Sequence, residues 1–198
     1  FTTVEKIDMV KNLGSQDVPM VLNTTPGVYA TQQGGGAGDS RINIRGFNQR
    51  NVAVMINGVP VNDMENGWVY WSNWDGLGDV TSSMQVQRGL GASNMAIASV
   101  GGTMNIVTDV ASFKRGLKYK QEFGSDAFFK ETVTANTGLL LNDKFAASVS
   151  VVRKVGDGQA DKTWTDAWAY FAALTYMPTN NLKFDLFAVG APQRHGQR

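Results

Sequence analysis

Apolar and polar side chains alternate along several segments in the second half of the chain. The alternating segments are residues 117–123, 129–139, 145–153, 168–176 and 182–188. A period of two residues is that of a β-strand, because successive side chains of a strand point to opposite faces of its sheet. We therefore predict five strands in a sheet whose two faces differ in polarity.

The connections between these segments alternate in length. Residues 141–143 and 178–181 read as short turns, whereas residues 155–167 form a longer polar loop. Short turns at one end and longer loops at the other are typical of outer-membrane β-barrels. Trp168 and Tyr176 bracket one strand, where interfacial aromatic side chains would lie. The alternation fits a soluble antiparallel sheet with one buried face equally well.

Five strands are too few to close a barrel, since single-chain barrels of this kind begin at about eight strands. An open edge would leave unpaired backbone groups in lipid, which the bilayer does not tolerate. The barrel interpretation therefore implies that most of the barrel lies outside this sequence.

The composition argues against several classes of function. The 18 Lys+Arg and 17 Asp+Glu give a net charge of +1. This charge lacks the positive excess that is typical of nucleic-acid-binding proteins. The sequence has no Cys and a single His, His195, which argues against a zinc centre or a His-dependent nucleophile. No apolar run approaches the ~18 residues of a transmembrane helix. We expect no catalytic residue, no bound metal and no cofactor.

The first 112 residues consist of short apolar segments separated by glycines. Pro19 stands in the first turn of a predicted short helix. Asn57-Gly58 is a turn signal between two apolar strands and predicts a hairpin. Residues 34–38 are predicted to form a flexible glycine-rich loop. The change in pattern places a domain boundary near residue 112, between domains of residues 1–112 and 113–198.

A series of motifs in residues 5–110 resembles, in the same order, the plug domain of TonB-dependent outer-membrane receptors. The motifs are Thr25-Pro26-Gly27-Val28, Ile44-Arg45-Gly46, Ile56-Asn57-Gly58-Val59-Pro60, Val86-Gln87-Arg88-Gly89, Ala92-Ser93 and Gly101-Gly102-x-x-Asn105-Ile106-Val107-Thr108. The resemblance implies a mixed α/β plug domain in residues 1–112. It also implies that residues 113–198 are the first antiparallel strands of a 22-stranded transmembrane β-barrel, which is incomplete in this chain.

The resemblance also implies a function. The expected activity is TonB-dependent import of a scarce nutrient (an iron chelate, cobalamin or a glycan) across the outer membrane of a Gram-negative bacterium, with the plug gating the barrel lumen. The expected partners are TonB, outer-membrane lipid, the external nutrient ligand and a surface lipoprotein, but no nucleic acid. TonB would bind an N-terminal box that is missing from this sequence. Two alternatives remain: a surface binding, scaffold or signalling component of the same fold without transport, and a glycan-processing enzyme that uses Asp63 or Glu65.

Residues 62–75 hold four aromatic side chains and three carboxylates, and the resemblance makes them an apical plug loop. Aromatic faces beside amides and acids suit stacking on sugar rings or planar ligands. The alternative is a packed structural loop. The candidate ligand-binding residues are Asp63, Glu65, Asn66, Trp68, Tyr70, Trp71 and Trp74.

Two arginines and several glycines complete the predicted sites. The resemblance implies that Arg45 and Arg88 pair with glutamates of the barrel wall and hold the plug. Glu122 and Glu131 are possible partners within this sequence, and later strands are favoured; the alternative is that both arginines are simply solvated. Gly46, Gly58, Gly89, Gly101 and Gly102 are predicted to allow positive φ or close packing.

Overall fold

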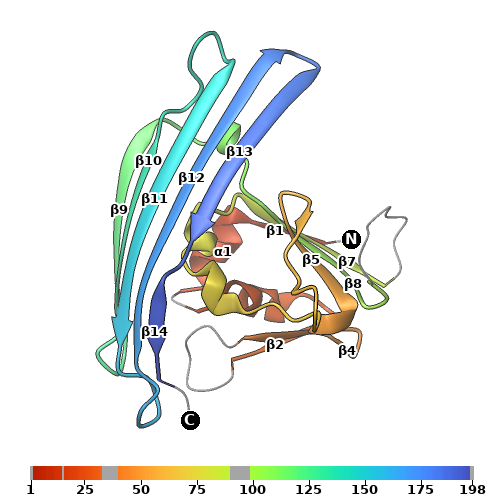
Figure 1. Cartoon of the computed structure of the whole chain (residues 1–198), viewed down its shortest axis with the longest axis vertical. Coiled ribbons are helices and arrows are strands. Elements are labelled where there is room, and N and C mark those ends of the chain that lie inside the picture. Colours follow the sequence, from red (N-terminus) through yellow and green to blue (C-terminus); the bar gives the residue numbers. More distant parts are fainter. Residues whose placement is uncertain (1, 15, 33–39, 90–98, 197–198) are drawn as a thin grey trace. The chain divides into compact units, whose positions relative to one another are not determined.

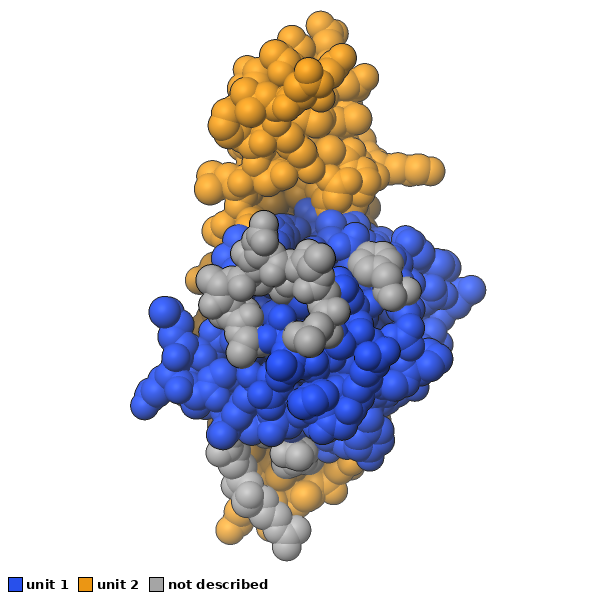
Figure 2. All heavy atoms as spheres, turned by 90° about the vertical axis from the view of Figure 1, so that its right-hand side faces the viewer, with its two compact units in different colours: residues 1–71, 81–108 blue, residues 72–80, 109–198 orange. Residues whose placement is uncertain are grey.

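The computed structural model describes residues 2–14, 16–32, 40–89 and 99–196 (Figure 1). They form two compact units, coloured separately in Figure 2. Unit 1 is Phe1–Trp71 with Thr81–Thr108, and unit 2 is Ser72–Val80 with Asp109–Arg198. The glycine-rich loop predicted at residues 34–38 and the Ala92-Ser93 motif lie outside the described residues.

Two small sheets make up unit 1. The first has the strand order β1-β7-β8-β5-β6, with β1 at Thr2–Glu5, β5 at Val52–Ile56, β6 at Val59–Pro60, β7 at Ser83–Arg88 and β8 at Gly102–Val107. The second joins β2 (Val28–Thr31), β3 (Arg41–Ile44) and β4 (Phe47–Asn48). Strands β5 and β8 are parallel and the other pairs are antiparallel, so unit 1 has a mixed architecture.

The core of unit 1 is apolar and centred on β5. All five residues of β5 are buried, which matches the continuous apolar run expected of a strand covered on both faces. Other fully buried side chains of unit 1 come from β8 beside it (Met104 and Ile106), from β7 (Met84 and Val86) and from β3 of the second sheet (Ile42 and Ile44). The predicted hairpin is confirmed, because Asn57 and Gly58 adopt φ values of 50° and 81° between β5 and β6, as a type I′ turn requires.

Short helices connect the strands of unit 1. The helix predicted at Pro19 is the 3-10 helix η1, Val18–Thr24, with the proline in its first turn. A second 3-10 helix, η2, spans Gln49–Asn51. The α-helix α1, Lys6–Asn12, was not predicted; Met9 is the one residue that it buries, so it leaves no apolar stripe in the sequence.

Unit 2 is built around one antiparallel sheet with the order β13-β12-β11-β10-β9. The strands are β9 (Gly116–Phe123), β10 (Phe129–Asn136), β11 (Phe145–Gly156), β12 (Thr165–Thr179) and β13 (Leu182–Gly190). The five predicted strands are confirmed, although β11 and β12 are longer than expected and β10 ends earlier. A short strand, β14 (Gln193–His195), also pairs with β12 and was not predicted. Short helices η3 (Trp71–Trp74), α2 (Leu77–Val80) and η4 (Val110–Ser112) precede the sheet.

The two faces of this sheet have the polarity opposite to that of a soluble protein. One face exposes large apolar side chains, among them Val133, Val149, Tyr170 and Leu186. The other face buries mostly small and polar side chains, together with Val152 and Phe171: Thr132, Thr134, Ala146, Ser148, Ser150, Ala169, Ala173 and Thr175. An apolar outward face and a polar inner face are typical of transmembrane β-strands.

Aromatic side chains border the exposed apolar face at both ends. Phe145, Tyr176 and Phe184 are register partners beside the short turns. Phe129 pairs with Phe123 near the longer loops, where Trp168 also lies. The eight residue steps from Phe145 to Arg153 on β11 correspond to about 27 Å of strand. At a tilt of about 40° this gives a band about 21 Å high, close to the height of a bilayer-spanning apolar band.

Among the described residues, none of the helices combines the length and the apolarity that crossing a membrane would require.

Candidate functional site

The predicted apical loop begins with a tightly hydrogen-bonded turn in unit 1. The Asn62 side chain accepts a hydrogen bond from the Val54 backbone N–H (2.8 Å) and donates to the carbonyls of Val52 and Gly67 (3.0 Å each). Asp63 Oδ1 accepts from the backbone N–H groups of Glu65 (3.0 Å) and Asn66 (2.9 Å). The Asp63 carboxylate therefore has a structural task in the turn, which argues against the enzyme alternative.

Trp68 follows this turn, and two arginines lie against its ring. The guanidinium carbons of Arg41 and Arg50 are 4.8 and 4.7 Å from the centroid of the Trp68 ring, within the range of cation–π attraction. Gly67, just before Trp68, has φ +74°, a backbone conformation that favours glycine. Sequence analysis missed both arginines, because β3 and η2 bring them to Trp68 from distant positions in the sequence.

The remaining aromatic residues of the segment have different environments. Trp71 is 2% exposed and donates from Nε1 to Gln49 Oε1 (3.0 Å), while Gln49 Nε2 donates to the Val69 carbonyl (2.8 Å). Its burial gives Trp71 a supporting role in place of the predicted ligand contact. Tyr70 is exposed, and its hydroxyl accepts from Asn66 Nδ2 (3.0 Å). Trp74 belongs to unit 2, so the predicted loop is divided between the units.

Arg45 and Arg88 lie close together in unit 1. Arg88 Nη1 donates to the Pro26 carbonyl (2.7 Å) and Nη2 to Thr2 Oγ1 (3.4 Å). The Arg45 side chain passes over Gly89, where a Cβ would be 2.6 Å from Nη1. In unit 2, Glu131 accepts from Tyr119 Oη (2.6 Å), and Glu122 pairs with lysines described below. The barrel-wall partners of the two arginines stay a prediction.

Two of the predicted structural glycines show why a side chain is excluded. Gly102 has φ +139°, and a Cβ there would overlap the Gln87 carbonyl oxygen. Gly101 needs no positive φ, but a Cβ would lie 2.8 Å from Phe47 Cβ. Gly46, Gly58 and Gly89 have φ values of 82°, 81° and 83°.

A group of buried charges in unit 2 was not predicted. Lys130 Nζ and Lys154 Nζ, on neighbouring strands, lie 2.7 Å from carboxylate oxygens of Asp79 and Asp75 respectively. Glu122 contacts Lys130 at 3.4 Å and Lys120 at 2.9 Å. Except for Lys120, these side chains are at most 13% exposed. We name the six residues the lysine–carboxylate network.

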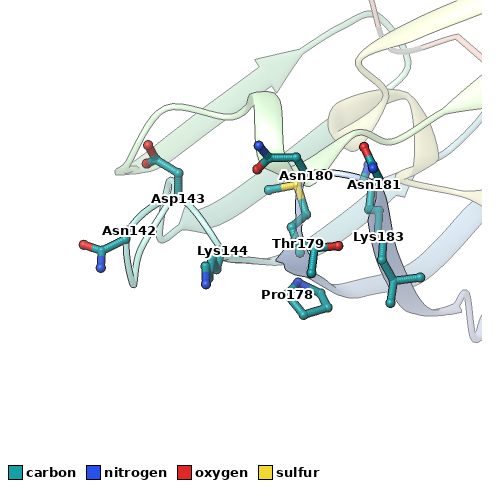
Figure 3. A pocket seen from close by; sticks show the side chains of 10 residues that line it. Asn142, Asp143, Lys144, Pro178, Thr179, Asn180, Asn181 and Lys183 are labelled. Atoms are coloured by element: carbon teal, nitrogen blue, oxygen red, sulfur yellow. The ribbon is translucent and has the colours of Figure 1, made fainter.

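A hollow of about 780 Å³ lies between the two short turns of unit 2 (Figure 3). Residues 142–144 and 177–183 line it. Lys183 already pairs with Asp109 (3.1 Å) and Asp185 (3.2 Å), so its charge is not available to recruit an anion. We assign no ligand to this gap between two turns.

The mixed sheets of unit 1 and the two-faced sheet of unit 2 have the arrangement expected of a plug domain followed by barrel strands. Residues 2–103 match the family model described as TonB-dependent Receptor Plug Domain, over half of the chain. The chain belongs to this family, whose members are transport receptors and not enzymes. The family resemblance identified from the sequence motifs is thereby confirmed.

Individual relatives extend the similarity beyond the plug. The chain is 28% identical over 180 residues to the ferrienterobactin receptor of Escherichia coli K12, covering 84% of this chain and 24% of that protein. It is 26% identical over 144 residues to the vitamin B12 transporter BtuB of Vibrio vulnificus, covering 70% and 23%. The ferric-catecholate import receptor Fiu of E. coli K12 has the same fold, with a TM-score of 0.72 at 18% identity over 97% of this chain and 26% of Fiu. The chain thus spans about a quarter of the length of these relatives.

Proposed function

We propose that the whole protein imports a scarce nutrient across the outer membrane by a TonB-dependent mechanism. The main observation in support is the two-faced sheet of unit 2, which follows the plug domain in the same chain. Its exposed apolar face, bordered by aromatic side chains, suits contact with lipid. In this proposal the sheet is the beginning of a 22-stranded barrel, and residues 1–112 form the plug that gates its lumen.

The ligand would be an anionic iron chelate, in preference to cobalamin or a glycan. Arg41 and Arg50 both lie against Trp68. Within the described part of the chain, neither guanidinium lies within ion-pair distance of a carboxylate. Two such cations beside an aromatic ring favour a negatively charged, planar ligand. Trp68, Tyr70, Glu65 and Asn66 would contact it, with Asp63 and Trp71 holding the loop; the contribution of Trp74 stays a prediction.

The transport cycle needs coupling between two sites. Ligand bound on the outer side of the plug would favour a plug state that TonB engages through an upstream box. Arg45 and Arg88 would hold the plug in place through glutamates of the barrel wall. No covalent step is required of any residue. Outer-membrane lipid surrounds the barrel in this proposal, and a surface lipoprotein is a further partner to test.

The test is uptake of radiolabelled ferric enterobactin and cyanocobalamin by cells that carry or lack the full-length receptor, with and without TonB. We expect receptor- and TonB-dependent accumulation of the iron chelate. Trp68→Ala should weaken its binding, whereas the matched variant Trp168→Ala, on the exposed face of β12, should not. Uptake of both compounds that is unchanged by deletion of the receptor would contradict the proposal for these ligands. TonB-independent binding without uptake would favour the alternative, a surface binding or signalling component.

A further inference from the structure

Two lysines face each other directly on the buried face of the unit 2 sheet. Lys130 of β10 and Lys154 of β11 are register partners, and both are buried. Like charges directly opposite each other destabilise a sheet, and burial increases the cost because it removes water from both ammonium groups. An anion beside the two lysines is therefore needed to offset the repulsion between them and the loss of their hydration.

In this structure the anion is supplied by two carboxylates from Ser72–Val80. Asp79 Oδ2 is 2.7 Å from Lys130 Nζ and Asp75 Oδ1 is 2.7 Å from Lys154 Nζ. Lys120 adds a third cation, 3.9 Å from Asp79 Oδ1 and 2.9 Å from Glu122. Three lysines and Glu122 on the strands leave a charge of +2, which Asp75 and Asp79 cancel.

The segment that carries these carboxylates, Ser72–Val80, contributes no strand to the sheet. Strands β9 to β12 pair with one another in continuous register, and the segment adds only the end of η3 and the four-residue helix α2. It approaches the strands closely at Gly76, where a Cβ would lie 3.0 Å from Ala169 Cβ and Val152 Cγ2. If the segment left, the strands would keep their pairing and expose the three lysines.

Anchoring the segment does not by itself explain these charges. Well-packed apolar side chains of similar volume hold two elements together at least as well as buried ion pairs, because the charges lose their hydration. Small side chains, such as Ser150 and Ala169, also line this face, and Gly76 of the segment packs against Ala169. The choice of lysine on both strands therefore suggests a use for the positive charge when the carboxylates are absent.

We propose that Lys120, Lys130 and Lys154 form a binding site for an anionic ligand with two or more negatively charged oxygens. Asp75 and Asp79 occupy the site at rest and act as a built-in competitor. The inference rests on the proposed function for its biological setting, in which an anionic nutrient meets the lysines after the plug moves. The binding site itself is tested without transport.

The first experiment uses the full-length receptor in outer-membrane vesicles, with inorganic pyrophosphate as the anionic probe. The variant Asp75→Asn with Asp79→Asn removes both charges while keeping side-chain shape. Lysine acetylation by an amine-reactive reagent is followed at each residue by mass spectrometry. We expect Lys130 and Lys154 to react roughly tenfold faster in the variant than in the wild type, because the segment no longer protects them. Pyrophosphate should restore protection saturably, and sucrose should not.

Exposed Lys144 is the internal control, and its acetylation should be equal in both proteins. The proposal is wrong if Lys130 and Lys154 stay unreactive in a folded variant, or if they react and pyrophosphate gives no protection. A misfolded variant, recognised by loss of the heat-modifiable band of the receptor, calls for a second design.

The second design exchanges the charges, with Lys154→Asp and Asp75→Lys combined with Lys130→Asp and Asp79→Lys. The ion pairs persist but the strands become negative. We expect surface binding of ferric enterobactin to be retained and its uptake to fall by about tenfold or more, since the strands would then repel an anion. Uptake at the wild-type rate would overturn the proposal. Absence of uptake in the wild type would instead count against the proposed function, and the acetylation experiment would still decide whether the anion site exists.

Discussion

The two units of this chain bury opposite kinds of side chain. Unit 1 encloses Ile44, Val54 and Met104 as a soluble domain would, whereas the sheet of unit 2 buries Ser148 and Ser150 and exposes Val149 and Tyr170. Both contain strands of ordinary geometry, so backbone hydrogen bonding does not account for the difference. The difference lies in the environment that each face meets: a protein core for unit 1 and, in the proposed setting, lipid for unit 2. Substitution of the same residue type in both units tests this comparison.

The largest effect is expected from an introduced charge. Val54→Asp would place an unpaired carboxylate at a site that is fully buried in unit 1, at a cost of about 4 kcal/mol or more. Val149→Asp, on the exposed face of β11, should cost about 1–3 kcal/mol in lipid, because aspartate on a lipid-facing strand is tolerated better than lysine or arginine. Urea unfolding of the full-length receptor in lipid vesicles measures both. Equal costs would mean that the two faces meet similar surroundings.

Breaking one pair of the lysine–carboxylate network should have the next largest effect. Lys154→Ala leaves the buried Asp75 carboxylate without its 2.7 Å partner, which should destabilise the receptor by about 3–5 kcal/mol. The double variant with Asp75→Ala removes the unpaired charge and should recover most of that loss. The same unfolding assay supplies the double-mutant cycle. If the double variant were no better than the single one, the pair would not be a coupled unit.

Features set by residues close together in the sequence could be predicted, whereas contacts between residues far apart in the sequence could not. The strands of unit 2 were predictable because alternation is local and persists through each strand, and the Asn57-Gly58 hairpin because its turn chemistry is contained in two residues. Lys154 and Asp75 are 79 positions apart, and no local pattern links them. The same holds for Arg41 and Arg50 around Trp68: the aromatic residue was identified, but its cationic neighbours come from other elements. The start of β12 was missed because Thr165 and Asp166 interrupt the apolar series, and its end was missed because Pro178 and Thr179 were assigned to the following turn.

A smaller effect is expected from adding a methyl group to glycine in each unit. Gly102→Ala would force a strained φ and a clash with the Gln87 carbonyl oxygen, costing unit 1 about 2–3 kcal/mol. Gly116 of β9 has no positive φ, and a Cβ added there would meet no atom within 4 Å, so Gly116→Ala should change stability by less than about 0.5 kcal/mol. Thermal unfolding of the two variants checks the contrast. A destabilised Gly116→Ala variant would indicate that the edge of β9 is covered in the whole protein.

The smallest effect on stability is expected from removing a hydroxyl on the polar buried face of unit 2. Its size shows whether water reaches this face. The hydroxyls of Thr134 and Ser150 are 2.8 Å apart across β10 and β11. If the face is dry, Ser150→Ala leaves the Thr134 hydroxyl unsatisfied and should cost about 1 kcal/mol, whereas adding Thr134→Val should remove most of that cost because no lone donor remains. If water reaches the face, both variants should unfold like the wild type, because water replaces the missing partner. The urea midpoints of the single and double variants therefore report how far the polarity of this face reflects packing against protein and how far it reflects access to solvent.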